Sequence, residues 1–178
     1  TLDASQDLIP QPVDFEILHE DDACIVVHKP AGCVVHPGAG NAGQTLVNGL
    51  IFRYPELAAL PRAGLIHRLD KNTSGLLIVA RTSYAFQHLT RQMAQRRIKR
   101  VYDALANGRF IGGGTVDAPI GRDPNNRTRM SVRGGGRNAV THYRIAAKFR
   151  MHTHLEVQLE TGRTHQIRVH LAHIGHPI

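Results

Sequence analysis

The 178-residue chain carries 22 Lys and Arg against 14 Asp and Glu, a formal net charge of +8, with 42% hydrophobic and 20% charged residues. This composition is typical of a folded globular protein and excludes a disordered chain. The apolar runs are too short to cross a bilayer, which argues against an integral membrane protein.

The first part of the chain predicts an arm, a hairpin, a loop and a short helix. Residues 1–13 are typical of a linker or arm. Apolar runs at Phe15–Leu18 and Cys24–His28, joined by an acidic turn, predict a β-hairpin. After a glycine-rich loop, Thr45 is expected to cap a helix that ends before Pro55.

Two short apolar runs flank the segment around Asp70. Gly64–Ile66 and Leu76–Ala80 are predicted to be strands that are buried on both faces. Thr82 or Ser83 then caps a helix with an apolar face. That face is expected to consist of Phe86, Leu89 and Met93.

The second half alternates strands with turns. Strands are expected at Ile98–Ala106 and Val140–Ala147, and the alternation of Leu155, Val157 and Leu159 with polar residues predicts a strand with one buried face. Thr164 is expected to cap a last helix with Gly175 just beyond its end. The inward side chains of that helix would be Ile167, Leu171 and Ile174.

These elements predict an α+β fold, a mostly antiparallel mixed sheet flanked by helices. Length alone favours one domain, from residue 14 to residue 178. Because the sequence stops directly after Gly175 and Pro177 without a polar tail, we expect the chain to be part of a longer protein.

Charge is distributed very unevenly. From Pro61 onward there are 20 Lys and Arg but only 6 Asp and Glu, and a positive surface of this kind attracts a polyphosphate backbone. The negative charge of Asp70 opposes that attraction, so we expect Asp70 to act in a chemical reaction on the bound nucleic acid and not in binding it. An ordinary turn aspartate is the simpler alternative, but Arg68 and Lys71 beside it would favour the ionised form that a nucleophile or a base needs.

Several motifs now agree in order along the chain. The segment His67–Gly75, with the sequence HRLDKNTSG, resembles the signature of the RluA-type family of RNA pseudouridine synthases. Arg100–Ala104 is similar to that family's second motif, and Leu159–His170 is similar to its third. The resemblance covers about residues 15–178. Within the family, the chain most resembles the enzymes that modify large-subunit ribosomal RNA.

The resemblance implies a pseudouridine synthase catalytic domain and a reaction in which a uridine is isomerised within RNA. Asp70 would be the essential nucleophile, attacking C1′ or C6 or assisting a glycal route. Tyr102 would stack on the base, and Arg168, expected to be half-buried, would pair with Asp70, although Arg163 could serve instead. The reaction needs neither cofactor nor metal.

Other arginines are expected to contact RNA. Arg68 takes the position of a family residue that helps to extrude the base, although a phosphate contact or a surface ion pair is equally compatible. A glycine-rich basic segment suits RNA, which proteins recognise largely through shape and backbone. The predicted RNA-binding residues are Arg68, Arg127, Arg129 and Arg163.

Alternative functions remain open at this point. A non-catalytic RNA-binding or ribosome-assembly module would use the same basic surface, and a glycoside or nucleoside hydrolase would need a second carboxylate. A zinc site among His165, His170, His173 and His176 is disfavoured because neither HExxH nor a CxxC pair is present.

The expected setting follows from the same reasoning. Two cysteines and no signal-peptide pattern favour the cytoplasm. The partner would be a hairpin loop of large-subunit ribosomal RNA, bound by a monomer without membrane contact. The family's S4-type RNA-binding domain and the C-terminal part of its catalytic domain have no counterpart in the sequence, so the sheet is expected to be incomplete at its C-terminal end.

Overall fold

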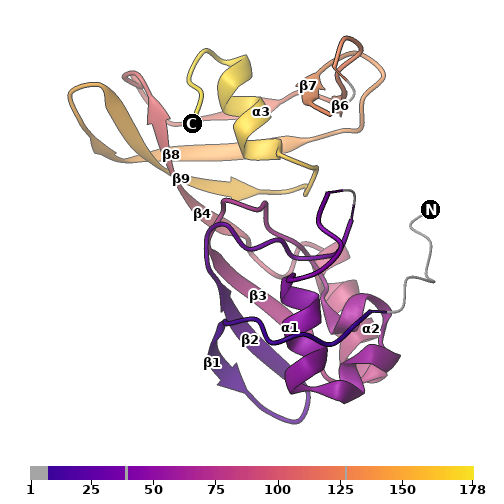
Figure 1. Cartoon of the computed structure of the whole chain (residues 1–178). Helices are drawn as coiled ribbons and strands as arrows, with labels where there is room; N and C mark the ends of the chain where they lie inside the picture. Colours follow the sequence, from indigo (N-terminus) through magenta and orange to yellow (C-terminus); the bar gives the residue numbers. More distant parts are fainter. Residues whose placement is uncertain (1–7, 39, 127) are drawn as a thin grey trace. The chain divides into compact units, whose positions relative to one another are not determined.

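The computed structural model describes residues 8–38, 40–126 and 128–178. The chain divides into two compact units, the first ending at Arg97 and the second running from Ile98 to Ile178. Figure 1 shows the helices and strands of both units.

The first unit contains a three-stranded antiparallel sheet. Its order is β1-β2-β3, formed by β1 (Glu16–Glu20), β2 (Cys24–Lys29) and β3 (Gly75–Ala80). The predicted hairpin is confirmed, since β1 pairs with β2. Strand β2 buries every second residue, Ile25, Val27 and Lys29, and is therefore the centre of this unit.

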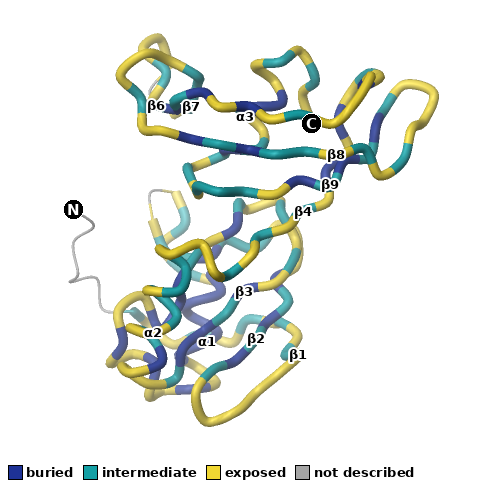
Figure 2. The backbone as a smooth tube through the Cα atoms, turned by 180° about the vertical axis from the view of Figure 1, so that it is seen from behind, coloured by how far each residue is buried: buried dark blue, intermediate teal, exposed yellow. Residues whose placement is uncertain are grey.

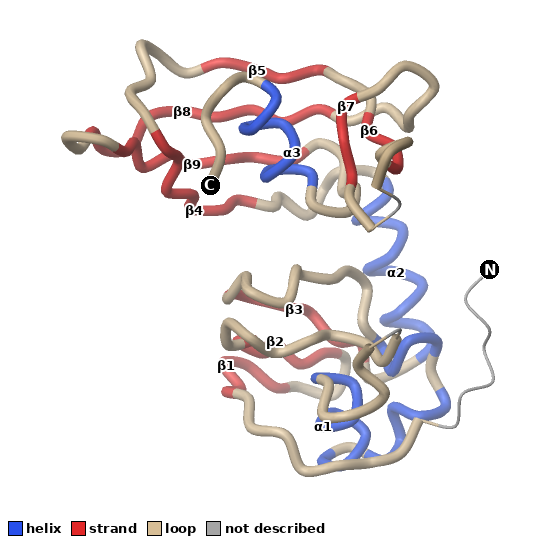
Figure 3. The backbone as a smooth tube through the Cα atoms, turned by 45° about the horizontal axis from the view of Figure 1, so that its top comes forward, coloured by secondary structure: helices blue, strands red, loops and turns tan. Residues whose placement is uncertain are grey.

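Helices α1 (Leu46–Arg53) and α2 (Ser83–Ala94) lie on the same side of this sheet (Figures 1 and 3). Both predicted caps are confirmed. Thr45 and Asn48 form a capping box, in which each side chain accepts a hydrogen bond from the other residue's backbone N–H. The Thr82 hydroxyl accepts a bond from the N–H of Ala85 at 3.1 Å.

The strand predicted at Gly64–Ile66 is wrong. Two short 3-10 turns, Pro55–Ala59 and Pro61–Gly64, precede it, and Arg62, Ala63 and Gly64 all have left-handed backbones, with φ values of 52°, 50° and 77°. Three left-handed residues in succession turn the chain too sharply for a strand. Only an isolated bridge between Leu65 and Val79 remains.

Strand β3 was predicted correctly in position but not in burial. Leu77, Val79 and Ala80 are buried, whereas Leu76 is 55% exposed. The strand therefore buries one face rather than two, and Figure 2 shows that buried residues of the first unit concentrate in β2, β3 and α1.

The second unit is built on a four-stranded antiparallel sheet of order β4-β9-β8-β5 and a separate β6-β7 hairpin. The strands are β4 (Val101–Asn107), β5 (Gly114–Asp117), β6 (Ile120–Arg122), β7 (Met130–Val132), β8 (Val140–Lys148) and β9 (His152–Leu159). Leu155 and Val157 of β9 are buried as predicted, with Leu159 half-buried. Helix α3 (Gln166–His173) lies over β8 and β9 (Figure 3), and its Leu171 joins the core of this unit while Ile167 and Ile174 pack against it.

The start of α3 differs from the prediction. Its N-cap is His165, with a left-handed backbone, rather than Thr164. The Gln166 side chain organises this end instead: Oε1 accepts bonds from the backbone N–H of Arg163 (2.9 Å) and from the hydroxyl of Thr161 (2.8 Å). Gly175 follows the helix with φ +87°, as predicted.

The α+β prediction is confirmed, and every strand pair among the described residues is antiparallel. None of the described helices is both long and apolar enough to cross a membrane.

Replacing Gly64 with Ala is expected to destabilise the protein by more than about 2 kcal/mol, because the new Cβ would overlap the backbone carbonyl of Ala80 and would also strain a left-handed position. Gly32→Ala is the matched control. Gly32 has φ +86° but open space around its Cβ position, so only the backbone cost of about 1 kcal/mol remains. Urea unfolding measures the free energy of unfolding of both variants. Equal losses of stability in Gly64→Ala and Gly32→Ala would show that the Ala80 contact is unimportant.

Candidate active site and nucleic-acid interface

Asp70 lies in the loop that leads into β3. Its side chain is half-buried, and its backbone carbonyl accepts a bond from the N–H of Thr73 at 3.1 Å, which closes a turn. The preceding Leu69 is buried and anchors the loop to the core. The loop therefore presents Asp70 at the surface from a fixed backbone.

The buried side chain of Lys29 is hydrogen-bonded to this loop. Its side chain is completely buried, and its ammonium donates hydrogen bonds to three backbone carbonyls: Pro30 (2.8 Å), Cys33 (2.8 Å) and Lys71 (3.0 Å). Burial lowers the pKa of Lys29, and the nearby Cys33 and Asp70 side chains partly counteract that effect. One buried cation thus joins the loop after β2 to the loop that carries Asp70.

Lys29 was not among the residues predicted from the sequence. A signal was present, because Ile25, Val27 and Lys29 are spaced two apart, so the lysine occupies an inward position of a strand with one buried face. A lysine in such a position needs several acceptors, and the glycine-rich loop that follows supplies the carbonyls of Pro30 and Cys33.

Positive charge gathers next to Asp70 within the first unit. Arg68 is exposed, two residues before Asp70. The pKa of His36 is lowered to about 4, chiefly by burial and further by the charges of Arg62 and Arg68. His36 is therefore neutral near pH 7, while the two arginines remain cationic beside it.

Tyr102 and Arg168 belong to the second unit. Tyr102 lies on β4, opposite Val157 of β9, and is half-buried against the core of that unit. Arg168 lies on α3 and is exposed, contrary to the expectation of half-burial. The reason is its place on the helix: Gln166, His170 and Leu171 form the inward face, and Arg168 falls outside it.

The predicted pairing of Arg168 with Asp70 joins residues of different units and stays a prediction. The same holds for a shared site of Asp70 with Tyr102.

Basic side chains also cluster around the β6-β7 hairpin. Arg129 and Arg133 are exposed, and Arg133 donates from Nη1 to the carbonyl of Arg122 at 3.0 Å. Arg163 donates from Nε to the carbonyl of Asn138 at 2.9 Å. Its pKa is lowered first by burial and then by the charges of Arg137 and Arg100, so each of these two arginines lies close enough to repel Arg163. Arg127 lies outside the described residues.

The C-terminal histidines have structural partners. His170 is buried, with Nδ1 2.8 Å from the Thr141 hydroxyl and Nε2 2.9 Å from the Ala118 carbonyl, and burial lowers its pKa. The His176 ring stacks near Phe110, with 4.0 Å between ring centroids. In the part of the chain that the structure describes, these histidines form no three-ligand group.

Residues 23–173 match the sequence profile of a family described as RNA pseudouridylate synthase. The chain belongs to this family.

Relatives within the family are close in sequence. The "Ribosomal large subunit pseudouridine synthase D" of Xanthomonas campestris pv. campestris is 57% identical over 95% of the chain and 51% of its own length. The protein of that name from Escherichia coli K12 is 53% identical over 95% of the chain and 52% of its own length. The chain thus spans about half the length of these curated relatives.

Solved structures of the family agree with the fold. The human "RNA Pseudouridylate Synthase Domain Containing 1" superposes with a TM-score of 0.72 at 27% identity, covering 92% of the chain and 66% of that protein. The human "RNA Pseudouridylate Synthase Domain Containing 4" superposes with a TM-score of 0.70 at 28% identity, covering 91% of the chain and 66% of that protein.

Replacing Lys29 with Met is expected to destabilise the protein by about 3–5 kcal/mol, because the carbonyls of Pro30, Cys33 and Lys71 lose the ammonium donor and only that of Lys71 keeps another, the N–H of Gly32. Lys99→Met, at an exposed position, is the control and should stay within about 0.5 kcal/mol of the parent protein. Chemical denaturation followed by far-UV circular dichroism provides the comparison. A Lys29→Met protein as stable as the control would mean that the ammonium does not hold these loops.

Proposed function

We propose that the chain carries the catalytic domain of an enzyme that isomerises uridine to pseudouridine in large-subunit ribosomal RNA. The observation that carries the proposal is Asp70, a carboxylate on a loop fixed by buried Lys29 in a member of the RNA pseudouridylate synthase family. The names of the close relatives supply the substrate class.

The reaction moves one base without adding or removing atoms. The N1–C1′ bond of uridine breaks, the uracil turns while it stays bound, and C5 bonds to C1′. The proton at C5 is lost and N1 gains one, so the product is an isomer and no electrons are exchanged. The Asp70 carboxylate attacks C1′ or C6, or assists formation of a glycal, and the bond to the aspartate, where one forms, is broken again before release.

Tyr102 and Arg168 have supporting parts in this proposal. The half-buried ring of Tyr102 leaves part of its surface for stacking on an extruded uracil, an interaction worth about 1–3 kcal/mol. The guanidinium of Arg168 orients the Asp70 carboxylate through an ion pair.

Arginines on both units bind the RNA backbone. Exposed Arg68 contacts the target nucleotide, while Arg127, Arg129 and Arg163 grip phosphates around the β6-β7 hairpin. The repulsion of Arg163 by Arg137 and by Arg100 supports this role, because phosphate between like charges relieves it. The proposal includes a monomer that acts in the cytoplasm on a hairpin loop.

Replacing Asp70 with Asn is expected to lower pseudouridine formation by more than about 1,000-fold, since the amide has no nucleophilic oxygen anion. RNA affinity should be kept or increase slightly, because one negative charge is removed. Asp14→Asn, an exposed carboxylate of the same unit, is the control and should leave both unchanged. Pseudouridine is counted in ribosomal RNA transcripts after carbodiimide labelling. If neither the parent protein nor the control forms pseudouridine although both bind RNA, a non-catalytic RNA-binding module is favoured instead.

Replacing Arg129 with Gln is expected to weaken RNA binding and to reduce the slope of log K against log salt by about 1, the loss of one phosphate contact. Arg144→Gln is the matched control, because Arg144 is an exposed arginine whose charge is already neutralised by a two-bond pair with Glu156. Filter binding at several salt concentrations measures both slopes. Equal slopes for the two variants would remove the hairpin from the RNA interface.

A further inference from the structure

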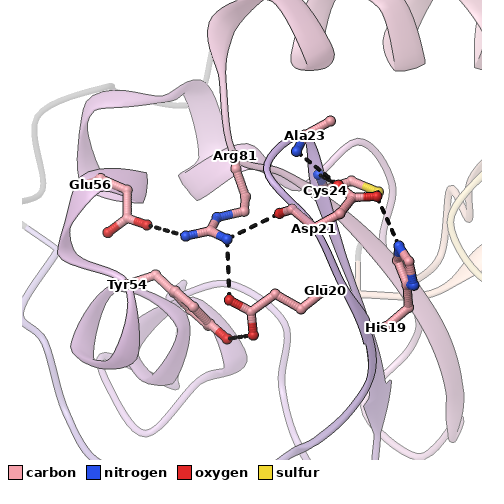
Figure 4. A network of polar contacts seen from close by, with 8 residues as sticks. All are labelled: His19, Glu20, Asp21, Ala23, Cys24, Tyr54, Glu56 and Arg81. Carbon is pink, nitrogen blue, oxygen red and sulfur yellow. Dashed lines mark hydrogen bonds and ion pairs between the residues drawn. The ribbon is translucent and has the colours of Figure 1, made fainter.

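Three potential metal ligands converge at the turn between β1 and β2, on the hairpin of the first unit (Figure 4). Nε2 of His19 lies 2.9 Å from Oδ2 of Asp21, and Sγ of Cys24 lies 3.9 Å from the same oxygen. All three ligand atoms are within 4.8 Å of one another. An imidazole, a carboxylate and a thiol therefore meet at one point.

The turn fixes this arrangement before any ion binds. Oδ1 of Asp21 accepts bonds from the backbone N–H groups of Ala23 (2.8 Å) and Cys24 (2.7 Å), and the N–H of Asp21 donates to the Cys24 carbonyl at 3.0 Å. Oδ1 is thereby occupied, and Oδ2 is left to face the other two ligands. The pKa of Asp21 is held below its usual range, first by the bond from His19 and then by these backbone bonds.

The distances suit a tetrahedral ion. With zinc bonds of about 2.0–2.1 Å to nitrogen, 2.0–2.2 Å to oxygen and 2.3 Å to sulfur, neighbouring ligand atoms lie about 3.4–3.6 Å apart. The N–O pair must therefore open by about 0.5 Å and the O–S pair must close by about 0.3 Å. His19 and Asp21 are exposed and Cys24 is half-buried, so side-chain rotation can supply these shifts.

A network on the other side of the turn holds it in place. Arg81 donates from Nη1 to the backbone carbonyl of Asp21 at 3.0 Å and to Glu20 at 3.2 Å, and from Nη2 to Glu56 at 3.2 Å. The Tyr54 hydroxyl donates to Glu20 at 2.6 Å. The positive charge of Arg81 is thus paired with two carboxylates and directed at backbone rather than at the ligand atoms (Figure 4).

We propose that His19 Nε2, Asp21 Oδ2 and Cys24 Sγ form a three-ligand site for zinc or a similar borderline divalent ion, with water as the fourth ligand. On binding, the Cys24 thiol loses its proton and the His19 ring coordinates through its neutral form. The Zn²⁺, thiolate and carboxylate then sum to zero charge. The site lies outside the proposed isomerisation, which uses no metal.

Binding of the ion competes with the proton on the Cys24 thiol. Burial and the Asp21 carboxylate raise the pKa of that thiol, so the metal must displace a proton from it. Of the other charged groups at the turn, Arg81, Glu20 and Glu56 are paired with one another, and Asp22 is exposed.

The experiment titrates the chelator-treated full chain with Zn²⁺ by calorimetry and with Co²⁺ by absorption spectroscopy. We expect one ion per chain and a thiolate-to-cobalt charge-transfer band in the near ultraviolet. Cys24→Ser should abolish that band and weaken Zn²⁺ binding at least tenfold, the lower end of the loss on removing even an outer partner of a ligand (about 10–100-fold). Cys33→Ser removes the only other cysteine of the sequence. This variant should keep both the charge-transfer band and the Zn²⁺ affinity of the parent protein.

The role of His19 as a ligand is tested by a variant and a matched control. His19→Gln should weaken Zn²⁺ binding at least about tenfold, whereas His28→Gln, whose ring faces Glu16 at 3.6 Å, should not. Because His19 is exposed, His19→Gln should fold normally, so the site can still be tested if Cys24→Ser folds poorly. Absence of a charge-transfer band in the parent protein, its persistence in Cys24→Ser, or equal affinities for the two histidine variants would overturn the proposal. Pseudouridine formation by the metal-free chain is expected to be unchanged, so the two functions are tested separately.

Discussion

The buried ammonium of Lys29 is the interaction on which the Asp70 loop depends. A lysine removed from water costs several kcal/mol unless its donors are satisfied, and here all three find carbonyls, at Pro30, Cys33 and Lys71. Two of these acceptors follow β2 and the third directly follows Asp70. A further bond from the N–H of Gly32 to the Lys71 carbonyl, at 2.8 Å, closes the same junction. The backbone beside Asp70 is therefore fixed by polar contacts to a buried ammonium, and a fixed backbone is the condition for a preorganised reactive group.

Positive charge has two different uses in this chain. At Lys29 it is buried, fully hydrogen-bonded and structural. At Arg163 it lies near the charges of Arg137 and Arg100, and the pKa of Arg163 is lowered first by burial and then by repulsion from these two charges. Such repulsion is a cost that the folded unit bears on its own and that a polyanion removes, so the cluster is better suited to a bound phosphate backbone than to stability. The cations that hold the fold and those that would bind RNA are thus distinguishable by burial and by partners, although both are simply basic residues in the sequence.

Local features of the fold were predictable and features set by distant contacts were not. The caps at Thr45 and Thr82 and the alternation in β9 follow from neighbouring residues, and the structure has them as expected. The Gly64–Ile66 strand was wrong because its left-handed turn is set by packing against Ala80, which the apolar letters do not reveal. The start of α3 was wrong because the side chain of Gln166 bonds to Val140 and Thr141 of β8 and to Arg163 and so fixes the chain ahead of the helix, contacts that Thr164 does not signal. In the candidate site the sequence motif identified Asp70 itself, whereas Lys29 was overlooked because lysine is usually a surface residue.

Strand β2 connects the two sites that we infer in the first unit. It begins at Cys24, a ligand of the proposed metal site, and ends at Lys29, beneath the Asp70 loop, and it pairs with β3 over its whole length, from Cys24 opposite Ala80 to Lys29 opposite Gly75. Gly64 packs against Ala80 as well, so both ends of β3 are fixed by close contacts. An ion bound at the turn would restrain the free end of the β1-β2 hairpin and stabilise this sheet by mass action. Because the ladder between the two ends is already complete, that restraint adds stability without moving the loop at the far end, which explains why metal binding and the chemistry of Asp70 should be separable.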